Sequence, residues 1–415
     1  MNLLRQKIEQ EIRERGPIPF SRYMELCLYH RDLGFYSRNV QQFGKAGDFY
    51  TSSDVHAVFG RLLARQFDEM WRALNSPANI ELLELGPGRG LFAQDVLDWS
   101  QKKFPDFFHA LRYILVESSP ALRERIKETL GDHLESGRAD LGDLDALDKA
   151  SSRNIPTIVF ANEFFDALPV EILGTKGSLR IDIRDGRFTE TWAQPSSEEL
   201  EFLDRYSVHP ELDERIEVPL VAQRFMEKIA TGIQRGFVLA IDYGYTREEQ
   251  LAGRHRGTLK ALRQHSISAD PYEAPGEQDI TADVNFTALA AAAEKYGMLA
   301  QKLITQSQFL MGIGEANQFA DAFEECRLPQ ERVKVALQLK HLVTPAGMGE
   351  SFQVLIASKG VYQKRVESLS GLNFGRAAST THVETSASAV SHGRRPAAGH
   401  KSRNHHYCAT SAGDS

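Results

Sequence analysis

The chain has 415 residues, of which 42% are hydrophobic and 25% charged, and its net charge is −7. This composition is typical of an ordinary globular protein, and the acidic balance disfavours nucleic acid as a partner, because phosphate backbones are bound by clustered Lys and Arg. The three cysteines lie too far apart for a disulfide framework or a metal motif, so no metal site is expected. They are Cys27, Cys326 and Cys408.

The first residues contain no apolar run long enough for a signal peptide or a membrane span. Residues 1–16 form an amphipathic stretch with helical spacing of Leu and Ile. The stretch also carries Glu9, Glu11 and Glu14, which a mitochondrial transit peptide would usually avoid. We therefore expect a cytoplasmic protein that is not inserted in a membrane.

Helical periodicity dominates residues 1–75, with helices predicted over 19–30 and 54–74 and a polar, glycine-rich loop between them. From residue 80 onwards, short apolar strands alternate with amphipathic helices. The strands are predicted over 80–85, 111–117, 156–165, 236–245 and 351–360, and the helices over 90–104, 120–134, 221–234 and 285–298. This alternation predicts an α/β fold in which a parallel sheet is covered by helices on both faces.

Two ranges depart from this rhythm. Residues 170–193 alternate at period two around glycine-containing turns, which predicts an antiparallel β meander inserted in the α/β core. After residue 366 the chain is dominated by Ser, Ala, Thr, Gly, Arg and His, so residues 367–415 are expected to be a disordered tail. The predicted organisation is a helical and loop region over 1–75, an α/β domain over 76–366 and this tail.

The stretch ELLELGPGRGLF begins at residue 81 and places Gly86, Gly88 and Gly90 between a predicted strand and a predicted helix. A dinucleotide fingerprint would need its third glycine at position 91, where a leucine stands, and a phosphate-binding P-loop would need Lys followed by Ser or Thr. Glycines let a ligand lie against the backbone, and the amides that open the next helix can bind a carboxylate.

Glu84, at the end of the same strand, would repel phosphate and attract an ammonium group. S-adenosylmethionine (SAM) carries both an ammonium and a carboxylate, so this loop favours SAM as the ligand. Glu117 ends the second strand, where an acid can accept hydrogen bonds from two ribose hydroxyls. A purely structural glycine turn and a merely solvated Glu117 are the alternatives.

A second signature, VFANEFFDALPVE, follows a later strand and contains Asn162, Glu163 and Asp166. In one interpretation, the two carboxylates hold a guanidinium, which pairs well with carboxylates, and leave a nitrogen lone pair facing a sulfonium methyl group. In another, Asn162 and a phenylalanine bind an amide or amino nitrogen, as Asn-Pro-Pro-aromatic loops do, although Glu-Phe stands here in place of Pro-Pro. A third interpretation is a cluster that only braces the loop.

Five segments together resemble the MidA family of SAM-dependent methyltransferases over about residues 5–360. They are PFSRYMELCLYHRDLGFYS, GDFYTSSDVHAVFG, LLELGPGRG, ANEFFDALPV and PGEQDITADVNFTAL. The resemblance implies a class I, Rossmann-like methyltransferase fold, SAM as the cofactor and protein-arginine methylation as the activity. The family includes a mitochondrial complex I assembly factor that dimethylates an arginine, so a protein substrate, and specifically a respiratory complex I subunit, is the implied partner. The start of this chain favours a bacterial, cytoplasmic member.

Matching the motifs residue by residue assigns the three glycines to the cofactor loop, Glu117 to the ribose and the 162–166 signature to the substrate. Lys45, Gly47, Asp48 and Phe49 match a loop that could close over the cofactor. Other strand-end and loop residues are weighed between pocket lining and ordinary packing or capping. They are Asp242 and Tyr243, and Gln278, Asp279 and Asp283, with Thr281 or Asp283 as a helix cap.

The leading hypothesis is a SAM-dependent methyltransferase that acts on a nitrogen, most simply that of a protein arginine. One alternative is a non-catalytic assembly chaperone that uses a methyltransferase fold. Another is a small-molecule or RNA N-methyltransferase, although the acidic balance argues against RNA.

Overall fold

The computed structural model describes residues 2–38, 57–143, 145–146, 149, 154–263, 266–268 (backbone only) and 270–375. These residues belong to one unit, Met1–Gly375. Their strands form a nine-stranded, a five-stranded and a three-stranded sheet. Among the described residues, no helix combines the length and the apolar character needed to cross a membrane.

The nine-stranded sheet carries the α/β core and has the order β15-β17-β10-β5-β2-β3-β4. Five strands along this path run parallel to one another, and they are β2 (Ile80–Leu85), β3 (Leu111–Val116), β4 (Ala139–Gly142), β5 (Thr157–Asn162) and β10 (Gly236–Tyr245). The other strands of this sheet are β14 (Val284–Asn285), β15 (Leu299–Ala300), β16 (Ile304–Thr305) and β17 (Phe352–Lys359). Since β17 runs antiparallel to β10, the sheet is mixed at one side. The predicted α/β fold is confirmed.

The first strand of this sheet, β2, lies between β3 and β5. Leu85 pairs with Val116 on one side and with Ala161 on the other. The chain proceeds from β2 to β3 and β4 on one side and then returns to β5 on the other side, which creates a topological switch point at the carboxyl ends of β2 and β5. Open α/β sheets bind their ligands at such a point.

Helices cover both faces of the sheet. Along the strands, Leu82 and Ile158 belong to one hydrophobic cluster, whereas the neighbouring Leu83 and Val159 belong to another, as the period of two in a strand requires. The first face is covered by α5 (Ala57–Ala73), α6 (Leu91–Lys103), α7 (Pro105–Ala110) and α8 (Pro120–Glu135), and the second by α11 (Leu220–Gly232) and α13 (Phe286–Lys295).

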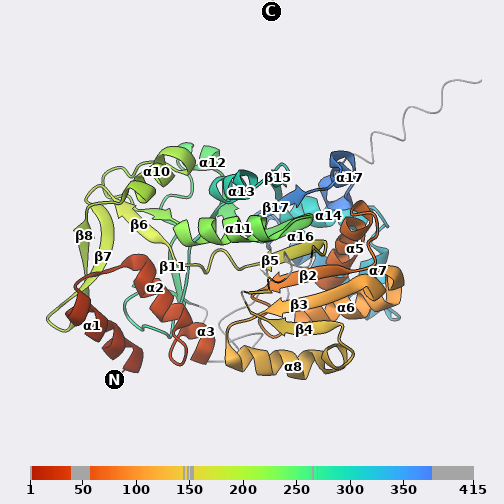
Figure 1. Cartoon of the computed structure of the whole chain (residues 1–415), viewed down its shortest axis with the longest axis horizontal. Coiled ribbons are helices and arrows are strands. Elements are labelled where there is room, and N and C mark those ends of the chain that lie inside the picture. Colours follow the sequence, from red (N-terminus) through yellow and green to blue (C-terminus); the bar gives the residue numbers. More distant parts are fainter. Residues whose placement is uncertain are drawn as a thin grey trace, which may run out of the picture. The chain divides into compact units, whose positions relative to one another are not determined.

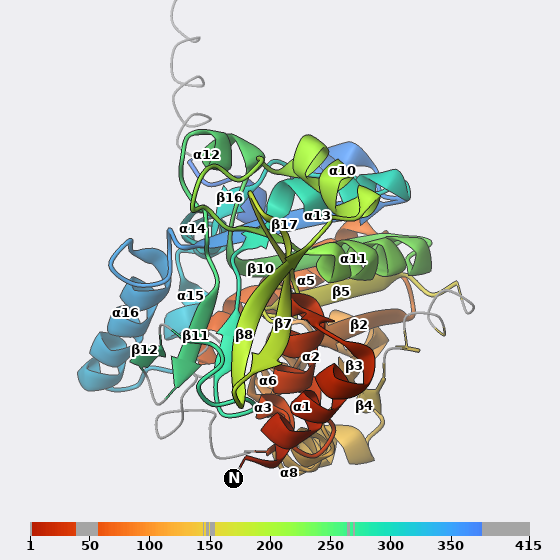
Figure 2. The same ribbon diagram turned by 90° about the vertical axis from the view of Figure 1, so that its left-hand side faces the viewer.

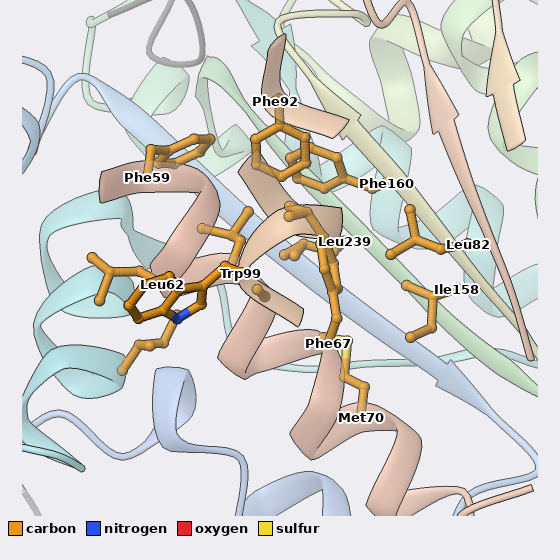
Figure 3. Close-up of a cluster of buried hydrophobic side chains, with 14 of the residues drawn as sticks. Phe59, Leu62, Phe67, Met70, Leu82, Phe92, Trp99, Ile158, Phe160 and Leu239 are labelled. Carbon is orange, nitrogen blue, oxygen red and sulfur yellow. The ribbon is translucent and has the colours of Figure 1, made fainter. Parts of the chain in front are cut away.

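The first face has an aromatic centre, shown in Figure 3. Phe92 of α6 stacks on Phe160 of β5 with ring centroids 4.6 Å apart, and Phe67 of α5 meets the same ring edge-on at 5.6 Å. All three side chains are buried. The helix that follows the glycine loop is therefore fixed to the strand that precedes the second signature.

The expected antiparallel meander is present as part of the five-stranded sheet. It consists of β6 (Glu171–Gly174), β7 (Gly177–Arg184) and β8 (Arg187–Ala193), and the sheet is completed by β1 (Ile18–Pro19) and β9 (Ile216–Val218). Two N-terminal helices, α1 (Leu3–Arg15) and α2 (Phe20–Tyr29), pack on it. Figure 1 shows these elements on the left, away from β2, β3 and β4, and Figure 2 shows β7 and β8 beside α1 and α2.

The remaining elements fill the space around the two sheets. They are α3 (Phe35–Arg38), α10 (Ser197–Tyr206), α12 (Arg247–Leu251), α14 (Gln306–Glu315), α15 (Ala320–Phe323), α16 (Pro329–Val343), α17 (Gln363–Glu367), the 3-10 turn η2 (Ser370–Leu372), and the strands β11 (Lys260–Arg263), β12 (Ser266–Ser268) and β13 (Asp279–Thr281) of the third sheet. Helix α5 packs on the main sheet, whereas α1 and α2 pack on the five-stranded sheet. The domain boundary expected after residue 75 stays a prediction.

Candidate active site

The backbone conformation of the loop after β2 is by itself enough to require its three glycines. Gly86, Gly88 and Gly90 have φ angles of 64°, 56° and 78°, in the left-handed region that other residues rarely adopt. The N–H of Gly90 donates to the carbonyl of Pro87 at 2.9 Å, which closes a tight turn directly before α6. The loop therefore turns the chain from the sheet edge into the helix.

The three glycines differ in what surrounds them. A Cβ on Gly90 would meet Ile126 and Leu130 of α8 at 3.4–3.5 Å, and one on Gly86 would meet the Phe164 ring at 3.1 Å. Within the described part of the chain, a Cβ on Gly88 would meet no atom within 4 Å. The middle of the loop thus faces open space, where a ligand can lie against the backbone.

Glu84 lies at the end of β2 and is only 5% exposed. Its Oε2 accepts a 2.8 Å hydrogen bond from the hydroxyl of Tyr113 on β3. Burial raises the pKa of the Glu84 carboxyl to about 8; the Tyr113 bond opposes this rise, and the negative charge of Glu117 adds to it. An ammonium group at this position would favour the ionised carboxylate.

Glu117 follows β3 directly and is also buried. Its Oε1 accepts the N–H of Ser119 at 2.7 Å. Burial raises the pKa of the Glu117 carboxyl to about 7, against the opposing effect of the Ser118 and Ser119 amides. Arg123 fixes the backbone here by donating to the Glu117 carbonyl at 2.9 Å and to that of Gly142 at 2.7 Å.

These residues fit SAM. The N–H of Gly86 donates to the carbonyl of Val116 at 3.2 Å, which joins the glycine loop to the end of β3 that carries Glu117. The negative charge of Glu117 also raises the pKa of the Glu84 carboxyl. An open backbone cradle and two carboxylates therefore meet at the switch point of the sheet, as an amino-acid and ribose ligand requires.

The second signature begins at the end of β5. Asn162 is the last residue of the strand, and its Nδ2 donates to Oε1 of Glu163 at 3.1 Å. Glu163 has φ = 50°, although it is not a glycine, and such a conformation costs about 1–3 kcal/mol. Its N–H donates to the carbonyl of Ile241 on β10 at 3.0 Å. The strained turn lifts the chain out of the sheet immediately after Asn162.

Asp166, three residues further on, is 5% exposed. Burial raises the pKa of its carboxyl well above the usual range, and the negative charges of nearby carboxylates raise it further. These are Asp242, Glu163, Asp279 and Asp283. The structure thus brings Glu163 and Asp166 together with three acids that follow them in sequence by at least 75 residues.

Asp279 enters this group from β13 and is fully buried. Its Oδ1 accepts the hydroxyl of Tyr36 at 2.8 Å, and burial raises the pKa of that tyrosine well above its usual value. Tyr36 belongs to α3, which contacts α8 beside the glycine loop. The sequence interpretation missed Tyr36, because a tyrosine on a four-residue helix carries no signal of a partner 243 residues away.

Two residues of the 275–289 segment have structural roles. Gln278 braces its own turn, with Oε1 accepting the Ala274 N–H at 3.1 Å and Nε2 donating to the Asp270 carbonyl at 3.0 Å. Oδ1 of Asp283 lies 3.0 Å from Nζ of Lys260, and Oδ2 lies 3.1 Å from Nδ1 of His255. The expected helix cap at Thr281 or Asp283 was wrong, because Asn285 caps α13 by accepting the Ala288 N–H at 3.0 Å.

The expected closing loop with Lys45, Gly47, Asp48 and Phe49 lies outside the described residues. Within the described residues, no group of three or more His, Cys, Asp or Glu side chains is arranged to hold a metal ion.

Comparisons with known proteins agree with this geometry. A family model described as "Putative S-adenosyl-L-methionine-dependent methyltransferase" matches residues 62–304. The chain is 30% identical over 393 residues to the protein arginine methyltransferase NDUFAF7 homolog, mitochondrial, of Drosophila melanogaster, which covers 86% of this chain and 85% of the relative. It is 27% identical over 368 residues to protein arginine methyltransferase NDUFAF7, mitochondrial, of Homo sapiens, with coverages of 82% and 80%.

A solved structure from Burkholderia thailandensis, bound to S-adenosyl-homocysteine, matches with a TM-score of 0.74 and 28% identity over 86% of this chain and 92% of that one. S-adenosyl-homocysteine is what remains of SAM after methyl transfer, so the cofactor of this chain is SAM. The resemblance drawn from the sequence is confirmed, and the chain belongs to the MidA family of SAM-dependent methyltransferases.

Proposed function

We propose that this methyltransferase modifies a guanidinium nitrogen of arginine in a protein substrate. The observation that carries the proposal is the group of carboxylates at the carboxyl edge of β5, beside the open glycine loop. Arginine stays charged at any physiological pH and pairs with carboxylates through two parallel hydrogen bonds. The printed names of the Drosophila and human relatives support the same substrate class.

In this proposal, the glycine loop and the two buried strand-end acids bind SAM. Gly88 leaves room for the cofactor, and Gly86 and Gly90 shape the turn around it. Glu84 faces the ammonium group and Glu117 the ribose hydroxyls.

Glu163 and Asp166 hold the substrate, and Asn162 orients Glu163 through their 3.1 Å hydrogen bond. SAM supplies a methyl group that is already activated on its sulfonium sulfur. The guanidinium nitrogen forms its bond to the methyl carbon as the carbon–sulfur bond breaks, and that nitrogen must then lose one proton. Burial and the neighbouring carboxylates raise the pKa of Asp166, so its carboxylate, once ionised beside the guanidinium, would accept that proton more readily than an ordinary carboxylate.

The first protein to test is a respiratory complex I core subunit, the partner implied by the family resemblance. The cytoplasmic location expected from the sequence stays a prediction. A chaperone role without turnover is separated from catalysis by the experiment that follows.

The experiment combines calorimetric titration of the full chain with SAM and NADH and transfer of a radiolabelled methyl group from SAM to candidate proteins. We expect SAM to bind in the micromolar range, NADH not to bind, and label to appear on arginine. The double variant Glu163→Ala, Asp166→Ala should keep SAM binding and lose transfer. The control is Glu198→Ala, Glu201→Ala, which removes two exposed acids of α10.

Label on another residue type would overturn the arginine proposal. Transfer at the normal rate by the Glu163, Asp166 double variant would overturn the assignment of these two residues. Complementation of a deletion strain by a double variant that has lost transfer would favour the chaperone.

A further inference from the structure

We propose that Asp242 is the positioning residue that holds the substrate loop, residues 163–166, in its active shape. The proposal rests on the function proposed above for Glu163 and Asp166. Asp242 is 1% exposed and lies on β10. In the parallel pairing of β10 with β5, Ile241 stands opposite Asn162, so Asp242 is the first residue beyond the paired region and lies directly beside the substrate loop.

One oxygen of Asp242 accepts three consecutive backbone amides of the substrate loop. The distances from Oδ2 are 3.2 Å to the N–H of Phe164, 2.9 Å to that of Phe165 and 3.3 Å to that of Asp166. The other oxygen, Oδ1, accepts the N–H of Tyr243 at 3.0 Å. With the bond from the Glu163 N–H to the Ile241 carbonyl, every amide from 163 to 166 is tied to the end of β10.

This arrangement needs a carboxylate. A carboxylate presents two acceptor oxygens, whereas the amide of asparagine presents one oxygen and one NH₂ donor. In Asp242→Asn, either the loop amides or the Tyr243 N–H would face another donor. Burial and the negative charge of Glu163 raise the pKa of the Asp242 carboxyl well above its usual value, and the bonds from the three loop amides oppose this rise.

The left-handed backbone conformation of Glu163 explains why loss of the Asp242 hydrogen bonds would change the loop. A glutamate at φ = 50° persists only where its surroundings impose that conformation. Without the Asp242 bonds, the turn can relax, and the carboxylates of Glu163 and Asp166 then move relative to the cofactor loop. A displacement of about 1 Å is enough to reduce transfer on the order of a hundredfold.

The test compares full-length wild type with Asp242→Asn. The matched control is Asp321→Asn, which removes another buried carboxylate that binds three donors, from Arg65, Trp99 and Asn317, in α15 on the flank of α5. Three quantities are measured: hydrogen–deuterium exchange of the amides of residues 164–166, the Kd for SAM, and the Kd for the tripeptide Gly-Arg-Gly in the presence of S-adenosyl-homocysteine.

We expect Asp242→Asn to raise loop exchange and the Kd for Gly-Arg-Gly at least roughly tenfold, with the Kd for SAM within about threefold. Asp321→Asn should lower the melting temperature without changing any of the three quantities. Unchanged loop exchange in Asp242→Asn would overturn the proposal, as would normal Gly-Arg-Gly binding despite a loosened loop.

Two further results separate this proposal from the one on which it rests. If wild type does not bind Gly-Arg-Gly, the arginine proposal fails, while loop exchange and the Kd for SAM still decide whether Asp242 holds the loop. If Asp242→Asn does not fold, hydrogen–deuterium exchange of the wild-type protein decides whether Asp242 holds the loop. Protection of residues 164–166 supports the tie, and exchange as fast as in an unstructured peptide overturns it.

Discussion

The Cδ2 atom of Phe164 lies 3.1 Å from the point that a Cβ on Gly86 would occupy. This contact joins the glycine loop that follows β2 to the substrate loop that follows β5, at the switch point between the two strands. The binding surfaces proposed for cofactor and substrate are therefore packed against each other. A substitution at Gly86 should affect both surfaces.

We predict that Gly86→Ala couples energetically to Phe164. The added Cβ requires the Phe164 ring to move, and the left-handed φ costs about 1–2 kcal/mol in addition. In a double-mutant cycle with Phe164→Leu, the free energies of unfolding should be non-additive by about 0.5–3 kcal/mol. The control cycle pairs Gly88→Ala with Phe164→Leu and should be additive, since a Cβ on Gly88 meets no atom of the described residues, including Phe164, within 4 Å. Equal coupling in the two cycles would contradict the prediction.

A second prediction concerns the open space at Gly88. The variant Gly88→Val should fold but lose SAM binding by about a hundredfold or more, because its side chain occupies the place of the ligand. The matched control is Gly186→Val, at the β7–β8 turn, which also has a positive φ and, among the residues that the structure describes, no atom within 4 Å of its Cβ position. Both variants should lose similar stability in denaturant titrations, and only Gly88→Val should lose SAM affinity in calorimetry. Wild-type SAM affinity in Gly88→Val would refute the assignment of the loop.

The core of the fold could be predicted from the sequence because its signals are local. The apolar runs at 80–85 and 236–245 are strands buried on both faces, and the glycine loop and Glu117 lie where strand ends place them. Such runs do not depend on distant partners, so composition and period identify them. The short strand β4 and the protruding helix α16 carry weaker patterns and were not predicted.

The rest of the proposed substrate site could not be predicted in the same way. Glu163 and Asp166 could be proposed together because they share one motif, but their neighbours Tyr36 and Asp279 come from α3 and β13, which only tertiary packing brings together. Asp242 was weighed as a residue that could line the pocket, since it ends a strand. Its three bonds to loop amides depend on the register of β10 against β5, which a single sequence does not contain.

A third prediction tests the aromatic centre that supports both loops (Figure 3). Phe160 is fully buried between the rings of Phe92 and Phe67. Phe160→Ala should lower the free energy of unfolding by about 3–5 kcal/mol, measured in urea. The control Leu337→Ala removes a leucine of α16 that is 62% exposed and should change it by less than about 0.5 kcal/mol. A loss at Phe160 as small as that of the control would show that the aromatic centre does not support the sheet.

The last prediction follows from the raised pKa of Glu84, about 8 in the folded chain against 4.5 for an ordinary glutamate. Between these pH values the folded state keeps a proton that the unfolded state has lost, so the stability contributed by this group is complete below pH 4.5 and is lost as pH rises through 8.

Glu84→Gln should therefore flatten the fall of the unfolding free energy between pH 5 and pH 8.5, in which one such group contributes a slope of up to about 1.4 kcal/mol per pH unit. Tyr113→Phe should extend the fall to higher pH, since removing a hydrogen bond that favours the ionised carboxylate raises the pKa of Glu84 further. The exposed residue Glu198 supplies the control, Glu198→Gln, which should leave the wild-type slope unchanged.

The same ionisation links to the cofactor, because an ammonium group beside Glu84 favours the carboxylate. Calorimetry of SAM binding at pH 7, in buffers of different ionisation enthalpy, should show protons released by wild type and fewer released by Glu84→Gln. Equal proton release by the two proteins would place the ammonium group away from Glu84.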